Sequence, residues 1–149
     1  MLSKIRVLVV DDYCPWMNFV SAALEATTKF QVVGQASNGL TALQKVAELN
    51  PDLVVLDIGL PDISGIRVAQ QIMDMSPTVR ILFLIENTAP EIVRAALRTG
   101  AQGYVVKSSA ARELLPALDA LMLDCYFVSA AANHFGPGDG PLFARLSDA

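Results

Sequence analysis

Residues 52–65 read DLVVLDIGLPDISG, a short apolar run that lies between two aspartates and leads into a segment rich in glycine and proline. The four residues LVVL are aliphatic without interruption, which is typical of a strand buried on both faces of a sheet. The glycines and proline that follow predict a loop, and a helical pattern of apolar residues begins near Ser64. The stretch therefore predicts a buried strand that ends at Asp57, a loop, and a helix.

The same alternation of strand and helix occurs five times along the chain. The predicted strands lie at residues 5–10, 30–36, 52–57, 80–85 and 102–107. The predicted helices lie at residues 15–28, 40–49, 64–75, 90–100 and 109–122. Strict alternation with right-handed crossovers predicts an α/β fold with helices on both faces of a parallel sheet. We expect a flavodoxin-like (βα)5 doubly wound sheet with strand order 2-1-3-4-5.

Length and composition restrict the organisation of the chain. A chain of 149 residues with 53% hydrophobic content fits one folded domain, which we place at residues 1–122. Residues 123–149 break the alternation, and their Gly/Pro-rich sequence FGPGDGPLF favours a C-terminal extension or interdomain linker. Within this extension, CYFVS is compatible with one short extra strand.

Charge and hydropathy exclude several classes of partner. Eleven Lys and Arg against fifteen Asp and Glu give a net charge of -4, so we expect this chain alone to bind no nucleic acid. The run VLVV after Lys4 and Arg6 is too short for a signal peptide, and no apolar stretch reaches the roughly 20 residues of a membrane span. We therefore expect a cytoplasmic protein without membrane contact.

Charged side chains follow three of the predicted strands at the point where each strand ends. Asp11 and Asp12 follow the first strand, Asp57 the third and Lys107 the fifth. In open parallel sheets ligands bind outside these carboxyl ends, and clustered carboxylates favour a hard cation such as Mg²⁺. If one carboxylate is a nucleophile, it forms an aspartyl phosphate held by the metal and Lys107. Asp57 is the best candidate, because the Gly59 backbone can approach the metal.

Three motifs in this order resemble the receiver domain of two-component response regulators. They are VVDD at 9–12, LDIGLPDISG at 56–65 and GAQGYVVKS at 100–108, and the resemblance covers roughly residues 4–122. It implies that Asp57 accepts a phosphoryl group from a sensor histidine kinase and that Lys107 contacts this group. It also implies that Mg²⁺ is bound by Asp11, Asp12, Asp57 and the carbonyl of Gly59.

The resemblance also carries expectations about signalling. Tyr104 occupies the position of an aromatic residue that turns inward on activation, and the spacing GYVVK resembles the subfamily with helix-turn-helix output domains. Phosphorelay signalling, regulation of transcription by an output domain beyond residue 149, and a homodimer through the fourth and fifth βα units are implied. The chain is then a phosphoacceptor and no enzyme, with at most slow self-dephosphorylation. The charged faces of helices four and five are either a solvated surface or the face through which receivers dimerise and contact their output domains.

Ile85 departs from the receiver pattern. The family has Thr or Ser at the end of strand four, whose hydroxyl bonds the phosphoryl oxygen, and isoleucine has no donor. Losing one charge-assisted hydrogen bond forfeits about 1.5 to 3 kcal/mol, which is comparable to the bias that such switches use. This residue favours the alternative that the chain is a phosphorylation-independent interaction or dimerisation module.

The sequence disfavours two other functions for the strand-end residues. A phosphatase-like enzyme is disfavoured because the two aspartates after strand one are adjacent, and a nucleotide-binding site because no glycine-rich phosphate loop follows any strand. A single strand-end aspartate is commonly a solvated loop residue, although four charged residues at these ends favour function. We expect the lone His134 to be exposed without a catalytic role, and Trp16 to belong to the core.

Overall fold

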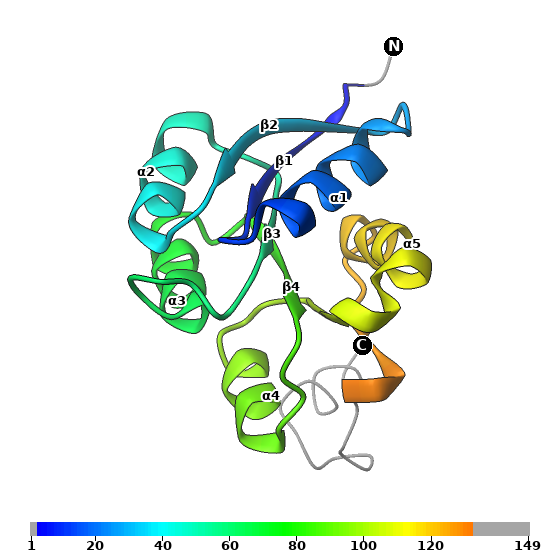
Figure 1. The fold of residues 1–149 in the computed structure, drawn as a ribbon. Helices are drawn as coiled ribbons and strands as arrows, with labels where there is room; N and C mark the ends of the chain where they lie inside the picture. The colour runs from blue at the N-terminus through cyan, green and yellow to red at the C-terminus, as the bar shows by residue number, and fades with distance from the viewer. Residues whose placement is uncertain (1–2, 133–149) are drawn as a thin grey trace. The chain divides into compact units, whose positions relative to one another are not determined.

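The computed structural model describes residues 3–132, and Figure 1 shows how the chain passes through its strands and helices. The strand order is β2-β1-β3-β4-β5-β6. The pairings β1–β2, β1–β3, β4–β5 and β5–β6 are all parallel. The predicted order 2-1-3-4-5 is thus confirmed, with a sixth strand added beside β5. The chain divides into two compact units, Met1–Ile81 and Leu82–Ala149.

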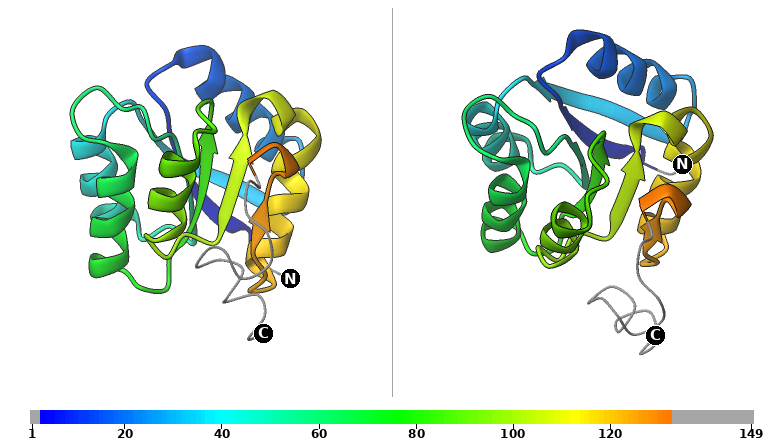
Figure 2. Two further views of the ribbon diagram at one scale, coloured as in Figure 1. Left: turned by 90° about the horizontal axis from the view of Figure 1, so that it is seen from below. Right: turned by 60° about the horizontal axis from the view of Figure 1, so that its bottom comes forward.

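The first unit contains three strands and three helices. Its elements are β1 (Ile5–Val10), α1 (Cys14–Glu25), β2 (Phe30–Ala36), α2 (Gly39–Leu49), β3 (Leu53–Leu56) and α3 (Gly65–Met75). Helix α1 covers one face of these strands, whereas α2 and α3 lie together on the other face (Figure 2). Because both faces are covered, the side chains of β3 are at most 1% exposed. The continuous apolar run that predicted this strand reflects that burial.

Side-chain caps define where the helices on the second face begin and end. The Asn38 side chain accepts a hydrogen bond from Thr41 N at 2.8 Å, and the Ser64 side chain accepts one from Ile66 N at 3.2 Å. Helix α2 ends at Asn50, whose φ of 47° is left-handed. The predicted boundary at Asn50 is therefore confirmed, and the helix predicted from Ser64 begins one residue later.

The buried face of α1 differs from the predicted one. The prediction assigned Trp16 to the core, but this residue is only partly buried and packs edge-on against Phe19 at 5.4 Å between ring centroids. Met17 is buried instead, whereas Val20 and Leu24 of the predicted apolar face are buried as expected. The helix begins at Cys14 with Pro15 in its first turn, and the apolar pattern near its start is compatible with more than one face. The prediction for Trp16 was wrong for that reason.

The second unit contains the remaining strands and helices. They are β4 (Arg80–Ile85, which begins in the first unit), α4 (Pro90–Leu97), β5 (Gly103–Val106), α5 (Ala110–Met122) and β6 (Phe127–Val128). Helices α4 and α5 lie on opposite sides of β4 and β5 (Figure 2). Helix α4 ends at Leu97, three residues before the predicted end, and Gly100 then takes a left-handed φ of 93°. Helix α5 begins one residue after its predicted start and continues through Pro116.

The segment after α5 joins the sheet. Phe127 and Val128 pair with Gly103 and Tyr104, which confirms that CYFVS forms a short strand. A 3-10 turn, Ala130–Ala132, follows, and Ala132 is fully buried. The Gly/Pro-rich sequence and His134 lie outside the described residues. No helix in the described part of the chain is long and apolar enough to span a membrane.

Candidate functional site

The backbone pairing of β1 with β3 brings two strand-end aspartates together. Val10 lies opposite Leu56 in the parallel register, and Asp57 N donates to the carbonyl of Val10 at 3.0 Å. Asp11, the next residue of β1, donates from its backbone to Ala36 of β2 at 3.1 Å. Both aspartates therefore begin at the same edge of the sheet, and their backbones are fixed by strand hydrogen bonds.

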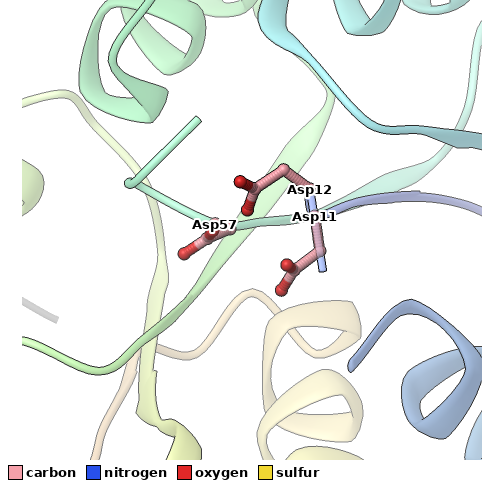
Figure 3. Close-up of side chains that lie close together, drawn as sticks. All are labelled: Asp11, Asp12 and Asp57. Atoms are coloured by element: carbon pink, nitrogen blue, oxygen red, sulfur yellow. The ribbon is translucent and has the colours of Figure 1, made fainter. Parts of the chain in front are cut away.

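Three carboxylates gather at this edge. Asp11, Asp12 and Asp57 each offer an oxygen, and these atoms all lie within 4.8 Å of one another. Figure 3 shows the three side chains projecting from the adjacent ends of β1 and β3. Asp11 is 3% exposed and Asp57 is 8% exposed, whereas Asp12 is exposed. Tyr13 N donates to Asp11 Oδ1 at 2.9 Å and so orients that carboxylate.

The composition of this cluster fits a hard divalent cation. Two buried carboxylates at such a separation repel each other by about 3 kcal/mol at an effective dielectric constant of about 20. A cation that binds between them removes this repulsion. The donor set contains only oxygen, and three carboxylates leave coordination positions for water and a further anion, which suits Mg²⁺ better than Zn²⁺ or copper.

The loop after Asp57 folds back against its own backbone. Gly65 N donates to the Ile58 carbonyl at 2.8 Å, and a Cβ on Gly65 would lie 2.1 Å from the Asp57 carbonyl oxygen. Only glycine allows α3 to begin so close to the loop. A Cβ on Gly59 would meet no atom closer than Asp57 Oδ2 at 4.0 Å, so the Gly59 backbone is near the Asp57 carboxylate.

Asp62 connects this loop to the start of α2. Its two carboxylate oxygens accept hydrogen bonds from Gly39 N at 2.7 Å and Leu40 N at 2.9 Å. These donors are the first two backbone N–H groups of α2, which have no partner within the helix. The hydrogen bonds from Gly39 and Leu40 lower the pKa of Asp62 from its usual 3.8. The sequence did not predict a role for Asp62, because nothing in its local pattern indicates a contact with residue 39.

Replacing Asp62 with asparagine is expected to lower stability in a pH-dependent way. A carboxyl with a lowered native pKa stabilises the fold above its unfolded pKa, and this contribution is lost as the pH falls through the native value. The urea midpoint of Asp62→Asn should therefore lie below that of wild type at pH 7, and the difference should narrow below pH 3.8. Because Asp62 is exposed, salt should also reduce the difference.

Asp74→Asn is the matched control for this prediction, since Asp74 is an exposed aspartate on α3. Its urea midpoint should follow that of wild type at each pH. A constant difference between wild type and Asp62→Asn from pH 7 to pH 3 would contradict the assignment of Asp62 as a charged cap.

The remaining predicted site residues belong to the second unit. Lys107 directly follows β5 in the 3-10 turn Lys107–Ser109 and is 6% exposed. Ile85 ends β4 and is 1% exposed. The Tyr104 ring is fully buried, packs against Phe83 at 6.3 Å, and donates its hydroxyl to the Asn87 carbonyl at 3.3 Å. Burial raises the pKa of the Tyr104 hydroxyl above its usual value.

Comparisons with known proteins agree on one family. A family model of the response regulator receiver domain matches residues 7–119. The virulence-factor transcription regulator BvgA of Bordetella pertussis is 33% identical over 135 residues, which are 90% of this chain but 64% of BvgA. The chemotaxis protein CheY of Listeria monocytogenes is 32% identical over 115 residues, covering 77% of this chain and 96% of CheY.

A solved structure extends this likeness to three dimensions. The crystal structure of a LuxR-family two-component response regulator from Aurantimonas sp. superposes with a TM-score of 0.84 at 26% identity. It covers 99% of this chain and 100% of that chain. This match confirms the predicted flavodoxin-like fold. The present chain spans less than two thirds of the length of BvgA.

Proposed function

We propose that Asp57 is the phosphoryl acceptor of this chain, which belongs to the response regulator receiver domain family. The cluster of Asp11, Asp12 and Asp57 at the ends of β1 and β3 carries this proposal. In it, the three carboxylates and the Gly59 carbonyl hold Mg²⁺, which neutralises charge on the incoming phosphoryl group. The proposed receiver domain comprises residues 1–122, and residues 123–149 form its extension.

The proposed reaction is a transfer between two side chains. An Asp57 carboxylate oxygen forms a bond to phosphorus while the bond between phosphorus and the imidazole nitrogen of a sensor kinase histidine breaks. The electron pair of that bond returns to the imidazole. Lys107 is proposed to contact the transferred group through its ammonium. The chain is no enzyme in this scheme, although water can release the phosphate slowly.

The proposed partners follow from the same scheme. A sensor histidine kinase supplies the phosphoryl group to this chain in the cytoplasm. Phosphorylation then alters a surface on the fourth and fifth βα units that forms a homodimer or contacts an output domain. Because the matched transcription regulators are longer than this chain, regulation of transcription is proposed through a domain beyond residue 149. Nucleic acid is not a proposed ligand of this chain alone.

The test is intact-mass analysis after incubation with acetyl phosphate, with and without Mg²⁺. We expect one phosphoryl adduct that requires Mg²⁺, and borohydride reduction of the adduct should map it to Asp57. Asp11→Asn and Asp12→Asn should each weaken Mg²⁺ affinity at least tenfold, or about 1.4 kcal/mol. Mg²⁺ binding without any adduct would refute phosphoryl acceptance while leaving the metal site in place.

A second candidate function is supported by the environment of Tyr104. Phe83 lies opposite Tyr104 in the register, and Ile85 and Val106 lie two residues further along the same face. The ring is fully buried on this face, and its hydroxyl reaches the carbonyl of Asn87, beyond Ile85. The aromatic residue is thus inward without any hydroxyl at position 85. This arrangement favours the alternative that the chain is an interaction or dimerisation module whose binding surface is the same with and without phosphorylation.

Ile85→Thr distinguishes the two candidates. The variant should lose about 1 to 2 kcal/mol of unfolding free energy, because a hydroxyl replaces apolar atoms at a buried position. On a sizing column, acetyl phosphate should change the elution of Ile85→Thr more than that of wild type. Ile81→Thr, at another buried position on β4, is the control. Acetyl phosphate should change its elution no more than that of wild type. An equal response in wild type would contradict the second candidate.

A further inference from the structure

The segment after α5 is fastened to β5 by backbone hydrogen bonds. Phe127 N donates to the Gln102 carbonyl at 3.0 Å, and Ser129 N donates to the Tyr104 carbonyl at 2.8 Å. Ala132 N then donates to the carbonyl of Ser129 at 3.0 Å, which closes the 3-10 turn. These bonds run along β5 toward its carboxyl end, so the segment follows the strand that leads to Lys107.

Ser129 is the polar residue at the centre of this attachment. It is fully buried, and its hydroxyl oxygen accepts a hydrogen bond from Val106 N at 3.0 Å. The same hydroxyl donates to Glu113 Oε1 on α5. A buried hydroxyl is costly unless it is bonded, and this one uses both its donor and an acceptor position. Ser129 therefore joins three elements, namely β5, α5 and the extension.

Two of the elements that Ser129 joins, β5 and α5, flank Lys107 along the chain. Val106, whose N–H it fixes, immediately precedes Lys107. The Lys107 carbonyl accepts from Ala110 N at the start of α5, and Glu113 lies in the first turn of that helix. The residue before Lys107 and the helix after it are thus both hydrogen-bonded to the Ser129 hydroxyl. Release of Ser129 would free the strand on one side of the lysine and the helix on the other.

We propose that Ser129 is a positioning residue for Lys107, through which the extension after α5 controls the lysine that contacts the phosphoryl group. The inference deepens the proposed function and rests on it for the role of Lys107. The extension then acts as a part of the signalling unit. Displacement of the segment that contains Ser129 would change how Lys107 is held, and movement of Lys107 would in turn loosen the extension.

The experiment uses the full chain and four variants. Ser129→Ala and Glu113→Ala each remove one partner, whereas Glu113→Gln keeps an acceptor oxygen for the Ser129 hydroxyl. Ser108→Ala removes an exposed hydroxyl beside Lys107 and is the matched control. For each protein, one measures amide exchange at Val106, labelling of the Lys107 amine by reductive methylation, Mg²⁺ affinity, and the rate of adduct formation with acetyl phosphate.

We expect Ser129→Ala to speed exchange of the Val106 amide about tenfold, because its acceptor is lost. Lys107 labelling should increase severalfold in Ser129→Ala and Glu113→Ala, and adduct formation should slow severalfold at unchanged Mg²⁺ affinity. Glu113→Gln and Ser108→Ala should resemble wild type. This separation of phosphoryl transfer from metal binding would not follow from a general loss of stability.

The outcomes separate this inference from the proposed function. Unchanged Lys107 labelling in Ser129→Ala overturns the inference, whether or not wild type forms an adduct. Faster labelling with an unchanged adduct rate also overturns it, because Ser129 would then be structural only. If wild type forms no adduct, the proposed function is refuted. The proposed effect of Ser129 on the contact between Lys107 and the phosphoryl group is then refuted as well.

Discussion

Asp57→Asn is expected to abolish the phosphoryl adduct completely. Asparagine has nearly the same shape, but its neutral amide is a far weaker nucleophile than a carboxylate. The neighbouring carboxylates cannot replace it in this prediction, because Asp11 is oriented by Tyr13 N and Asp12 is exposed. Intact-mass analysis after incubation with acetyl phosphate and Mg²⁺ measures the loss directly.

Stability provides the control for this variant. Removing one of three clustered carboxylates reduces their mutual repulsion when no metal is bound, so the unfolding free energy of Asp57→Asn without Mg²⁺ should not fall by more than about 1 kcal/mol. Asp74→Asn, an exposed change on α3, should form the adduct as wild type does. A residual adduct on Asp57→Asn would identify another acceptor and refute the assignment.

Gly65→Ala is expected to have the largest effect on stability of any single methyl addition in the loop between β3 and α3. Helix propensity alone favours this change by about 0.5 to 1 kcal/mol, because alanine is a better helix former than glycine. In the structure, however, the new Cβ would lie 2.1 Å from the Asp57 carbonyl oxygen and 2.7 Å from Ile58 Cα. Both atoms are backbone and cannot rotate away. We expect a loss of about 3 kcal/mol of unfolding free energy.

The matched control is Gly59→Ala, in the same loop. Its Cβ would meet no atom closer than Asp57 Oδ2 at 4.0 Å, an ordinary van der Waals contact, and Gly59 does not take a positive φ. The unfolding free energy of this variant should remain within about 1 kcal/mol of wild type in chemical denaturation. Equal stability of Gly65→Ala and wild type would show that α3 does not begin against the backbone of Asp57.

The sequence was sufficient for features that depend on local pattern. Strands β1, β2 and β4 begin and end at the predicted residues. For β1 and β4 the reason is that buried parallel strands require continuous apolar runs. Asp11, Asp12 and Asp57 could be predicted to meet because the topology places strand ends at one edge of the sheet. The Gly65 contact was not predicted, because a close backbone approach leaves no periodic signal.

Contacts between distant residues were also beyond the sequence. Asp62 and Gly39 are separated by 23 residues, as are Ser129 and Val106. No periodicity in the sequence predicts a hydrogen bond between residues so far apart. Glu113 was assigned to a face either solvated or used for assembly, whereas the structure bonds it to Ser129. The prediction that Trp16 belongs to the core was wrong for another reason. A helix with apolar residues on two faces does not indicate which face is buried.

Strand β6 determines from which side of the sheet the chain departs. Helix α5 runs back toward the edge where the strands begin, so a chain leaving directly after Met122 would depart from that edge. Because β6 is parallel to β5, residues after Val128 depart instead from the edge that carries Lys107. The four residues of β5 span roughly 13 Å at about 3.3 Å per residue. Strand β6 follows the first two of these residues, and Ser129 reaches the N–H of Val106, so the described end of the chain lies beside the strand that leads to Lys107.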